Sequence, residues 1–321
     1  MNNLPSVSVI VPIYNGERDL PDLISCLLAQ TYRGEQVEYL LVDNNSSDRT
    51  ADLLQAAAKD AANQGIAIRP LTEKEIQSSY AARNTGIKAA TSEILAFTDA
   101  DCRPIPDWLQ LLVEPFANPK VGLVVGEILG LPGKTLLEKY AEQKSVLSQK
   151  FTLEHPFCAY GQTANLAIRR EAFTEVGLFR PYLTTGGDAD ICWRILQSTD
   201  WKLEFAAKAI IRHRHRSNLQ ELRSQWRRYG KSNRYLHELY GVELMREATN
   251  KEIIYRLSRW LLKELPVASF GAIAGKNSWL EAIATPIDLI GFYSRSLGQK
   301  ETQLPESAKQ IEWLSNQSKN P

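Results

Sequence analysis

Two carboxylates at the end of an apolar run are the residues of this chain best suited to metal chemistry. Asp99 and Asp101 are separated by one residue and follow the run Ile94–Phe97. Carboxylate oxygens are the ligands that Mg²⁺ and Mn²⁺ prefer, and a cation held there can also bind a substrate diphosphate. Open α/β sheets bind ligands at the carboxyl ends of their strands. The alternative is an ordinary turn, because Asp also forms local hydrogen bonds in turns.

Polar side chains follow three of the expected strands at the points where those strands end. Because the carboxyl ends of parallel strands meet at one sheet edge, we expect one shared site. Asp43 could accept a hydrogen bond from a base N–H, which would favour uracil, thymine or guanine over cytosine. Its alternative is a helix cap, although residues 45–47 already offer cap-type side chains before Thr50. The three clusters are Tyr14, Asn15 and Glu17; Asp43, Asn44 and Asn45; and Asp99 and Asp101.

The elements that must position these residues alternate along the first 125 residues. Short β-branched apolar runs alternate with longer segments of helical spacing, which is typical of parallel βαβ units in an α/β fold. We predict strands at residues 7–11, 39–42, 66–68, 94–97 and 121–125. We predict helices at residues 19–30, 50–62 and 80–90.

The pattern after residue 126 is less regular. It predicts a helix at 135–150, a strand at 163–168, a helix from about Asp188, and one basic helix over 212–240. Residues 247–297 hold two amphipathic segments, and the last twenty or so residues are polar and expected to be loose.

Composition excludes several classes of protein. The chain has 321 residues, 44% of them hydrophobic, which is enough for one large core with or without a small appendage. A net charge of +1 argues against nucleic-acid binding. Four well-separated cysteines predict neither a disulfide framework nor a zinc site. Neither a signal sequence nor a run of roughly 18 to 20 apolar residues is found, so we expect a cytoplasmic location.

Several motifs resemble, in order and spacing, those of the family 2 glycosyltransferases. They are VSVIVPIYNGE at 7–17, VDNNSSDRT at 42–50, ARNTG at 82–86, DAD at 99–101 and TTGGDAD at 184–190. The resemblance covers residues 6–240. It implies a GT-A fold, a nucleotide-sugar donor, a divalent cation, either Mg²⁺ or Mn²⁺, and inversion at the anomeric carbon.

The resemblance also implies how the chain is organised. Residues 1–240 would form a GT-A domain, a Rossmann-like sheet with helices on both faces. Its nucleotide-binding half would be 1–126 and its acceptor half 127–240. A C-terminal amphipathic helical segment at 241–300 and a polar tail at 301–321 would follow.

By the same resemblance, Tyr14 would stack on the base and Glu17 would reach the nucleoside. Glu17 could instead be a first-turn acid that complements a helix dipole. Arg83 would lie near the nucleotide, where a guanidinium suits bidentate contacts with base or phosphate oxygens. Its alternative is an exposed arginine on a helix.

The resemblance assigns Asp99 to the ribose and the metal surroundings, and Asp101 to direct metal ligation. The cation would neutralise charge on the departing nucleoside diphosphate. His213, at the end of an apolar run, could complete the metal shell as an imidazole ligand. A partly buried histidine at a strand end is the equal alternative.

The segment from Thr184 resembles the family's Glu-Asp motif, which supplies the catalytic base. Gly187 stands at the Glu position and Asp188 at the base position. Asp188 would take the acceptor hydroxyl proton, with Asp190 as the second choice. Alternatively, Asp188 caps or charges a helix N-terminus, which would lower its basicity unless burial or a nearby charge raises it.

Residues 212–234 carry eight Lys and Arg against one acid, Glu221. That density suits a diphosphate clamp or an anionic lipid surface. Gln225, Arg228 and Tyr229 loosely resemble the Gln-x-x-Arg-Trp motif of processive family members. Those enzymes carry membrane-spanning helices, so we expect single transfer here.

The aromatic residues of 253–297 fit an interfacial membrane anchor or, as we favour, a helix packed on its own domain.

We therefore predict an inverting, metal-dependent glycosyltransferase of the hexosyltransferase type, with Asp188 as base. The expected partners are a nucleotide sugar, with a UDP-sugar favoured, and a sugar or lipid-linked acceptor of the cell envelope. Peripheral contact with the inner face of the cell membrane stays open. The alternatives are a non-catalytic nucleotide-sugar sensor, suggested by Gly187, and a nucleotidyltransferase, which usually has a Gly-rich phosphate loop that this chain lacks.

Overall fold

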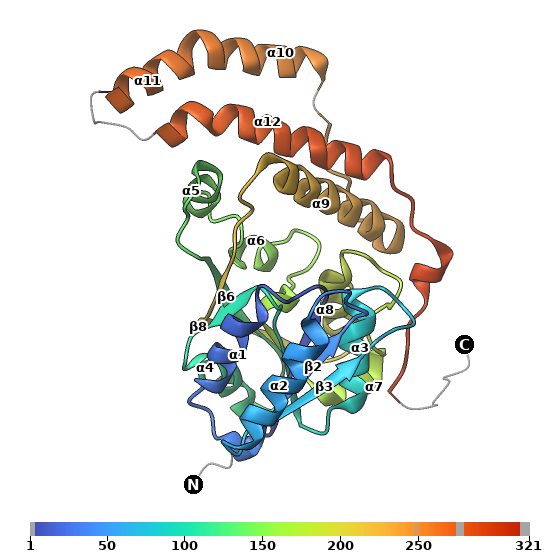
Figure 1. Ribbon diagram of the computed structural model, residues 1–321. Helices are drawn as coiled ribbons and strands as arrows, with labels where there is room; N and C mark the ends of the chain where they lie inside the picture. Colours follow the sequence, from blue (N-terminus) through green and yellow to red (C-terminus); the bar gives the residue numbers. More distant parts are fainter. Residues whose placement is uncertain (1–3, 248, 274–278, 315–321) are drawn as a thin grey trace. The chain divides into compact units, whose positions relative to one another are not determined.

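The chain forms two compact units in a computed structural model that describes residues 4–247, 249–273 and 279–314 (Figure 1). The sheet unit comprises residues 1–129, 147–214 and 305–321. The helical unit comprises residues 130–146 and 215–304. The expected boundary at residue 240 does not coincide with this division, because residues 215–240 belong to the helical unit.

The sheet unit is built on one eight-stranded sheet in the order β3-β2-β1-β4-β7-β6-β8-β5. The pairs β1–β2, β1–β4 and β2–β3 are parallel, as the βαβ pattern predicts. The pairs β4–β7, β6–β7 and β5–β8 are antiparallel. The strands are β1 (Val7–Ile13), β2 (Val37–Asp43), β3 (Ala67–Thr72), β4 (Ile94–Phe97), β5 (Cys102–Pro104), β6 (Val121–Gly130), β7 (Leu166–Arg169) and β8 (Lys202–His213).

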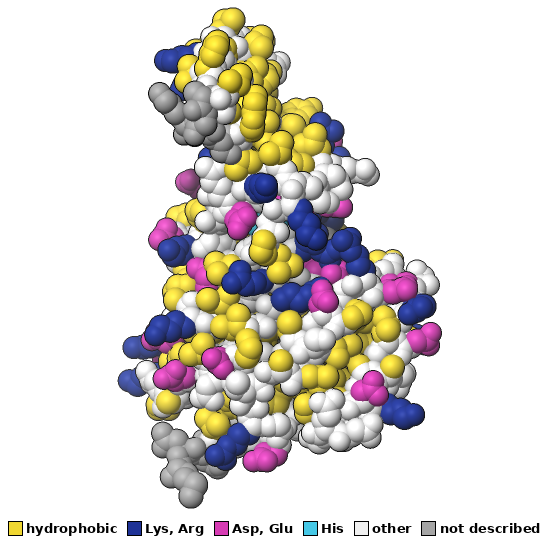
Figure 2. Space-filling view, turned by 60° about the vertical axis from the view of Figure 1, so that its left-hand side comes forward, with side chains coloured by type: hydrophobic (Ala, Val, Ile, Leu, Met, Phe, Trp, Pro, Cys, Tyr) yellow, Lys and Arg dark blue, Asp and Glu magenta, His cyan; other side chains and the backbone are white. Residues whose placement is uncertain are grey.

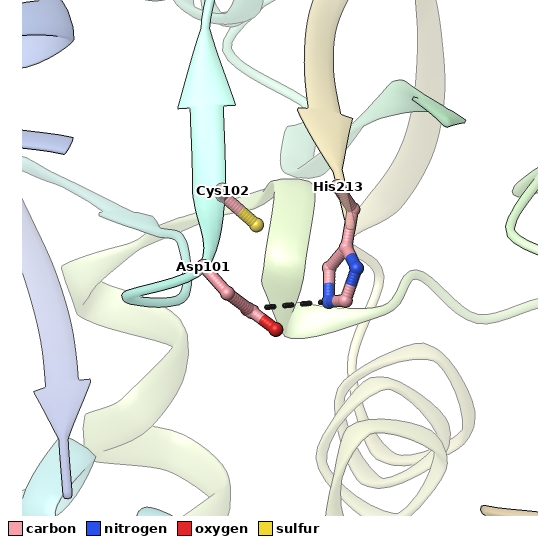
Figure 3. Close-up of side chains that lie close together, drawn as sticks. All are labelled: Asp101, Cys102 and His213. Carbon is pink, nitrogen blue, oxygen red and sulfur yellow. Dashed lines mark ion pairs between the residues drawn. The ribbon is translucent and has the colours of Figure 1, made fainter. Parts of the chain in front are cut away.

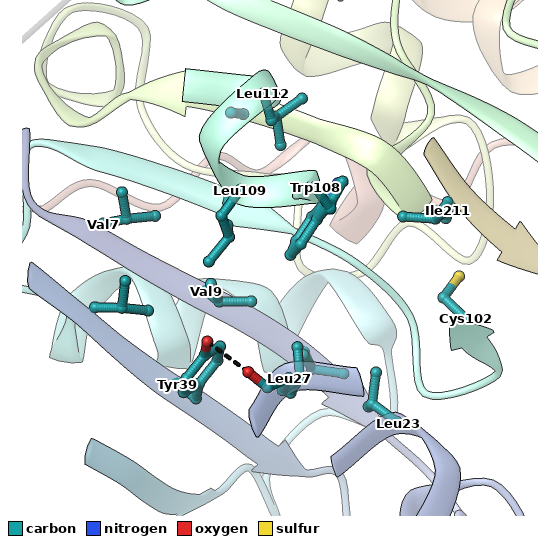
Figure 4. Close-up of a cluster of buried hydrophobic side chains, with 14 of the residues drawn as sticks. Val7, Val9, Leu23, Leu27, Tyr39, Cys102, Trp108, Leu109, Leu112 and Ile211 are labelled. Carbon is teal, nitrogen blue, oxygen red and sulfur yellow. Dashed lines mark hydrogen bonds between the residues drawn. The ribbon is translucent and has the colours of Figure 1, made fainter. Parts of the chain in front are cut away.

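Helices cover both faces of this sheet, because the central strands are apolar on both sides. Val9 of β1 packs in a core with residues of α1, α2 and α4 (Figure 4). On the other face, a Cβ at Gly86 of α3 would lie 2.5 Å from Ile10, so α3 lies directly against β1. The helices of this unit are α1 (Leu20–Leu28), α2 (Thr50–Ala62), α3 (Ser79–Ala89), α4 (Trp108–Val113), α6 (Lys150–Leu153), α7 (Arg170–Val176) and α8 (Gly187–Ser198).

Hydrogen bonds satisfy the polar groups of this core. Tyr39 donates from its hydroxyl to the Leu27 carbonyl at 2.9 Å, as Figure 4 shows. Fully buried Trp108 donates from Nε1 to Asn165 Oδ1 at 2.7 Å. Buried polar atoms without partners are costly, so these bonds fix how α1 and α4 lie on the sheet.

A C-terminal strap, residues 305–314, completes the sheet unit. The Leu178 backbone N–H donates to the Glu312 carbonyl at 2.7 Å. Lys88 Nζ lies 2.7 Å from Glu312 Oε2, and Ala308 in the short helix η5 (Glu306–Lys309) is fully buried. This part of the tail is therefore packed, not loose as predicted; residues 315–321 lie outside the described residues.

The helical unit contains α5 (Leu136–Gln143), α9 (Leu219–Tyr240), α10 (Asn250–Arg259), the π-helical turn η4 (Trp260–Glu264), α11 (Leu265–Ile273) and α12 (Trp279–Lys300). Two glycines let the backbones of α9 and α12 touch. A Cβ at Gly230 would lie 1.9 Å from the Arg295 carbonyl oxygen, and one at Gly298 would lie 1.9 Å from that of Arg227. Among the described residues, no helix is long and apolar enough to cross a bilayer.

Two predicted helices differ from the structure. The helix expected at 135–150 ends at Gln143, because Ser145 adopts a left-handed φ of 49°. The helix expected at 212–240 begins only at Leu219, because Arg212 and His213 extend strand β8. Asn218 then caps the helix by accepting a hydrogen bond from the Glu221 backbone N–H at 2.9 Å.

Candidate active site

The loops that follow β1 and β2 are held together by hydrogen bonds. The Asn15 N–H donates to Ser46 Oγ at 2.9 Å, and the Gly16 N–H donates to Thr50 Oγ1 at 2.8 Å. Asn15 has a φ of 49°, a left-handed conformation that asparagine tolerates better than most residues. The result is a fixed turn that presents Tyr14 to solvent with 58% of its surface exposed. An exposed ring of this kind is free to stack on a base.

Asp43 ends β2 and is only 8% exposed. Its Oδ1 accepts a hydrogen bond from the Ser46 backbone N–H at 3.0 Å. Its Oδ2 has no hydrogen bond within the described part of the chain, so one oxygen remains for a base N–H. Residues 45–47 do not cap α2 as expected: the N-cap is Arg49, and the Thr50 N–H at the start of the helix donates to Asp48 Oδ1 at 3.0 Å.

Glu17 lies at the edge of this turn and forms an ion pair with Arg49, with Oε1 and Nε 3.3 Å apart. Both side chains are largely exposed, and exposed pairs contribute about 0–1 kcal/mol. The pair therefore opens at small cost.

Arg83 and Asp99 form the central ion pair of the sheet unit. Arg83 Nη2 donates to Asp99 Oδ1 at 2.6 Å, and only 4% of the Arg83 side chain is exposed. Arg83 Nε is buried and has no hydrogen-bond partner among the described residues. Leaving a donor of a charged group unpaired is costly, so this guanidinium retains hydrogen-bonding capacity for a ligand.

The Tyr80 ring fills the space beside Gly187. A Cβ at Gly187 would lie 2.6 Å from the Tyr80 ring, and the Gly187 N–H donates to the Tyr80 hydroxyl at 3.0 Å. Tyr80 also stacks on Phe179, with ring centroids 5.6 Å apart, and lies beneath the Arg83 guanidinium. The absence of a side chain at the family's Glu position thus has a packing reason, which the sequence alone did not reveal.

Asp101 and His213 come together through the pairing of β5 with β8. That antiparallel register sets Cys102 opposite His213, so Asp101 lies beside the imidazole. Figure 3 shows the two side chains converging, with Asp101 Oδ1 3.3 Å from His213 Nε2. Asp101, Cys102 and His213 form a group whose potential ligand atoms all lie within 4.8 Å of one another.

The hydrogen bond on the other ring nitrogen indicates what His213 can bind. His213 Nδ1 lies 2.8 Å from the Arg214 carbonyl oxygen, an acceptor, so Nδ1 carries a proton. In the neutral imidazole, Nε2 then presents a lone pair toward the Asp101 carboxylate. Metal-binding histidines commonly have this arrangement, with a backbone carbonyl holding the second nitrogen. Two facing acceptors suit a shared cation.

The third member of the group, Cys102, fits a cation less well. Burial, followed by the negative charges of Asp99 and Asp101, holds the pKa of the Cys102 thiol well above its usual value. A thiol is a weak ligand compared with a thiolate, and Cys102 belongs to the apolar core. Asp99, whose carboxylate accepts from Arg83, is not part of the group.

Asp188 lies in the first turn of α8, after Gly186 in the left-handed conformation with a φ of 81°. Its Oδ1 accepts a hydrogen bond from Thr163 Oγ1 at 2.9 Å. Burial raises the pKa of Asp188, and the negative charge of Asp99 adds to this, while Arg83 and Thr163 oppose it. The carboxylate is therefore more basic than an exposed aspartate.

Asp190 has a different environment and is not available as a base. It is fully buried. Arg180 Nε donates to its Oδ1 at 2.8 Å, and Arg194 Nη2 donates to its Oδ2 at 2.9 Å. Both oxygens of Asp190 are held by guanidinium groups, which indicates a structural ion pair between α8 and the segment before it.

Asn84, next to Arg83, also has a structural role. Its side chain donates to the Phe179 carbonyl at 2.8 Å and accepts from the Phe179 N–H at 3.1 Å. It further donates to Glu312 at 3.1 Å. These partners lie 95 and 228 residues away, so no local pattern could have revealed them; Tyr80 and Thr163 were missed for the same reason.

In the helical unit, the start of the basic helix α9 borders a polar groove of about 490 Å³. Gln225 Nε2 donates to the Tyr229 hydroxyl at 3.1 Å, while Arg228 is exposed. The motif residues Gln225 and Arg228 both line the groove. Its lining residues are Arg216, Asn218, Gln220, Glu221, Ser224, Gln225 and Arg228.

Comparison with known families identifies the family to which the chain belongs. The model of Glycosyl transferase family 2 matches residues 8–177, which is more than half of the chain, and that of Glycosyl transferase family group 2 matches residues 94–279. The chain belongs to glycosyl transferase family 2. The predicted resemblance is confirmed, and with it the transferase class of this enzyme.

Individual relatives agree. Glycosyltransferase AglE of Haloferax volcanii is 33% identical over 265 residues, which cover 81% of each chain. The undecaprenyl-phosphate 4-deoxy-4-formamido-L-arabinose transferase of Pectobacterium carotovorum is 36% identical over 115 residues, 36% of this chain and 34% of that protein.

A solved structure supports the fold. The mannosyltransferase PcManGT of Pyrobaculum calidifontis, in complex with GDP-Man and Mn²⁺, superposes with a TM-score of 0.62 at 17% identity, covering 93% of this chain and 88% of that one. The predicted GT-A fold of this glycosyltransferase is confirmed.

Proposed function

We propose that this glycosyltransferase transfers one sugar, with inversion, from a nucleotide-sugar donor to an acceptor hydroxyl. In this proposal a divalent cation is bound by Asp101 and His213, and Asp188 is the general base. The observation that carries it is geometric: the sheet unit holds two facing cation ligands, Asp101 Oδ1 and His213 Nε2 at 3.3 Å, and a half-buried carboxylate, Asp188, fixed by Thr163 at 2.9 Å. Burial raises the pKa of Asp188, the direction that a base needs. Basicity and nearby nucleotide-binding groups are what a transferase base needs.

The metal assignment rests on the donor set. Asp101 Oδ1 and the Nε2 lone pair of His213 face each other at 3.3 Å, and the Nδ1 hydrogen bond fixes the imidazole. One carboxylate and one imidazole leave room for diphosphate oxygens, and this ligand set suits Mn²⁺ or Mg²⁺. When bound, the cation would neutralise the charge that develops on the departing nucleoside diphosphate. PcManGT, which shares the fold, was solved with Mn²⁺.

The donor side chains would act in three ways. Tyr14 would stack on the base, and Asp43 Oδ2 would accept from a ring N–H of the base, which selects uracil, guanine or thymine over cytosine. Arg83 would donate to phosphate or ribose oxygens while Asp99 orients it. We favour a UDP-sugar, although PcManGT was solved with GDP-Man; both bases offer the required N–H.

Proton transfer follows from the position of Asp188. As the acceptor oxygen forms a bond to the anomeric carbon, the bond from that carbon to the diphosphate oxygen breaks. Asp188 would take the hydroxyl proton, and the electron pair would leave with the diphosphate. A single in-line displacement of this kind inverts the anomeric configuration. Thr163, bonded to Asp188 Oδ1 at 2.9 Å, would hold the carboxylate toward the acceptor.

We also propose a lipid-linked or cell-envelope acceptor and a place at the inner face of the cell membrane. Two observations support this. One relative is a transferase named for undecaprenyl phosphate, and exposed apolar side chains gather on the helical unit.

Calorimetry with UDP, GDP, dTDP and CDP, with and without Mn²⁺, tests the donor site. We expect one or more of the nucleotides whose base has a ring N–H (UDP, GDP or dTDP) to bind, and binding to need the metal. Asp101→Ala should weaken binding about tenfold or more, since it removes a charged ligand. Asp60→Ala, which removes an exposed acid of α2, should not. If no nucleotide binds the wild-type protein, the donor site is wrongly assigned.

A further inference from the structure

One face of the segment α10–η4–α11 exposes large apolar side chains. Leu262, Phe270 and Ile273 are exposed by 78%, 75% and 75%. Ile254 and Leu261 on the same segment are also more than half exposed. Figure 2 shows hydrophobic side chains gathered over this end of the helical unit. A contiguous apolar patch on a protein surface usually marks an interaction site.

These residues form one continuous stripe because of the π-helical turn. Ile254 and Leu257 of α10 and Leu261 at the start of η4 are exposed and follow an i, i+3, i+7 spacing. A π turn inserts one extra residue into the helix. The stripe therefore continues at Leu262, Phe270 and Ile273, one position later than an unbroken α-helix would place it.

The opposite side of the segment packs on α12. Trp260 Nε1 donates to the Ala282 carbonyl at 2.8 Å, and Thr285 donates to Glu264 at 2.6 Å. Ala268 is buried on this side. The exposed stripe is thus the outer face of a helix whose inner face already has a partner.

Basic residues flank the apolar stripe. Residues 250–273 contain four cations and two acids, which gives a net charge of +2. The acids are already paired: Glu252 with Arg246 at 2.8 Å, and Glu264 with Arg259 at 2.9 Å. Lys251 and Lys263 are exposed. The four cations are Lys251, Arg256, Arg259 and Lys263.

We propose that this outer face, Ile254 to Ile273, lies flat on the surface of a bilayer that contains anionic lipids. The apolar stripe enters the boundary between headgroups and acyl chains, and the lysines contact lipid phosphates. Because no described helix can span a bilayer, the segment lies on the membrane and does not cross it. The inference rests on the proposed function in one respect: a lipid-linked acceptor would be the reason for the enzyme to lie on a membrane.

Charge favours a lipid surface over a second copy of the chain. A symmetric dimer through this face would bring its cations against the same cations of the other copy, and like charges disfavour that contact. An anionic bilayer complements them. Trp279 at the start of α12 is half-exposed, and tryptophan is enriched where proteins meet the headgroup region.

Flotation of the full chain with lipid vesicles tests the proposal. We expect binding to vesicles of phosphatidylcholine with about one third phosphatidylglycerol, and much weaker binding to phosphatidylcholine alone. Leu262→Glu and Phe270→Glu should each weaken binding about tenfold or more, because each places a charge in the apolar boundary. Lys263→Glu should weaken binding to the anionic vesicles only.

The matched control is Ala56→Glu, which adds the same charge at an exposed position of α2 in the sheet unit. It should bind vesicles as the wild type does. Circular dichroism of every variant shows whether the fold is intact. Equal binding to both vesicle types, or equal loss in Ala56→Glu, would overturn the proposal. A third outcome would also overturn the proposal: sedimentation velocity shows that the wild type is a dimer and that Leu262→Glu is a monomer, while Leu262→Glu still binds vesicles as the wild type does.

Nucleotide binding, measured on the same preparations, separates this inference from the proposed function. Wild-type protein that binds nucleotide but no vesicles would refute the membrane surface and leave the donor site standing. Wild-type protein that binds vesicles but no nucleotide would refute the donor site and leave the membrane surface standing.

Discussion

Arg83 donates a hydrogen bond to Asp99 at 2.6 Å, and the charges of both residues act on Asp188, the proposed base. Arg83 lowers the pKa of Asp188 and Asp99 raises it. The two charges of the pair thus act on Asp188 in opposite directions, and burial decides the net shift upward. The basicity of Asp188 should therefore respond to changes at either partner.

Arg83→Gln removes the positive charge that lowers the pKa of Asp188. We expect the acid limb of the pH profile of kcat/KM, which reports the base of the free enzyme, to move to higher pH. Asp99→Asn should move it to lower pH. The measurement is sugar transfer across the pH range with a fixed metal concentration. Shifts in the same direction for both variants would contradict the assignment.

Asp188→Asn should abolish most of the transfer while nucleotide binding persists, since amide oxygen cannot take the proton. General-base catalysis contributes about 10² to 10⁴ in rate, so kcat should fall by that amount with little change in the Kd of the nucleotide. Rapid-quench transfer and calorimetry on the same protein check both parts. A variant that retains full kcat would show that the base is elsewhere.

The same substitution should not destabilise the protein. A group whose folded pKa is raised stabilises the fold only at low pH, and this contribution is lost as pH rises through the folded pKa. Ionised Asp188 therefore costs stability at neutral pH. We expect the unfolding free energy of Asp188→Asn at pH 7 to equal or exceed that of the wild type. The difference should shrink as the pH is lowered. Urea unfolding at several pH values measures it.

Asp190→Asn, two residues from Asp188, should instead lower the free energy of unfolding. It leaves Arg180 and Arg194 with a buried neutral partner, and breaking a buried pair costs about 3–5 kcal/mol. Urea unfolding at pH 7 should show a large loss for Asp190→Asn and none for Asp188→Asn. Similar losses in both would mean that the two carboxylates do not have separate roles.

Gly187→Glu restores the family's usual residue but should destabilise this chain, because its Cβ would meet the Tyr80 ring at 2.6 Å. Overpacking costs about 1–3 kcal/mol. Gly34→Glu is the control, since nothing lies within 4 Å of a Cβ there. In the double variant Tyr80→Ala, Gly187→Glu, the losses should be less than additive. Additive losses would contradict the steric account.

The sequence predicts the parallel half of the sheet well because its signals are local. Val7–Ile13 and Ile94–Phe97 are short apolar runs between helical segments, and β4 and α2 have the predicted bounds. The antiparallel half is less predictable. Strand β8 (Lys202–His213) mixes exposed, half-buried and buried residues without a regular period, and its pairing with β5 depends on residues more than 100 positions away.

The candidate site likewise combines residues that the sequence reveals with residues that only the folded structure reveals. Asp99, Asp101 and Asp188 are visible as motifs, because the first two follow an apolar run and Asp188 follows a Gly-Gly pair at the start of a helical segment. The functions of their neighbours are not: Thr163 bonds Asp188, and the Tyr80 ring occupies the place beside Gly187. Both depend on segments joined only by folding. The sequence offers Asp190 as the second choice for the base, and only the structure shows the two arginine partners that give it a structural role.

The strap that joins Glu312 to Asn84 sets the order in which the enzyme can be completed during synthesis. Asn84 leaves the ribosome 228 residues before its partner. At translation rates of about 5–20 residues per second, that interval is on the order of ten to fifty seconds. Until then the sheet unit lacks its final segment, while all of the helical unit has already been made. A nascent chain stalled in this interval would expose the surface that Ala308 normally covers, so the first unit to begin folding is the last to be finished.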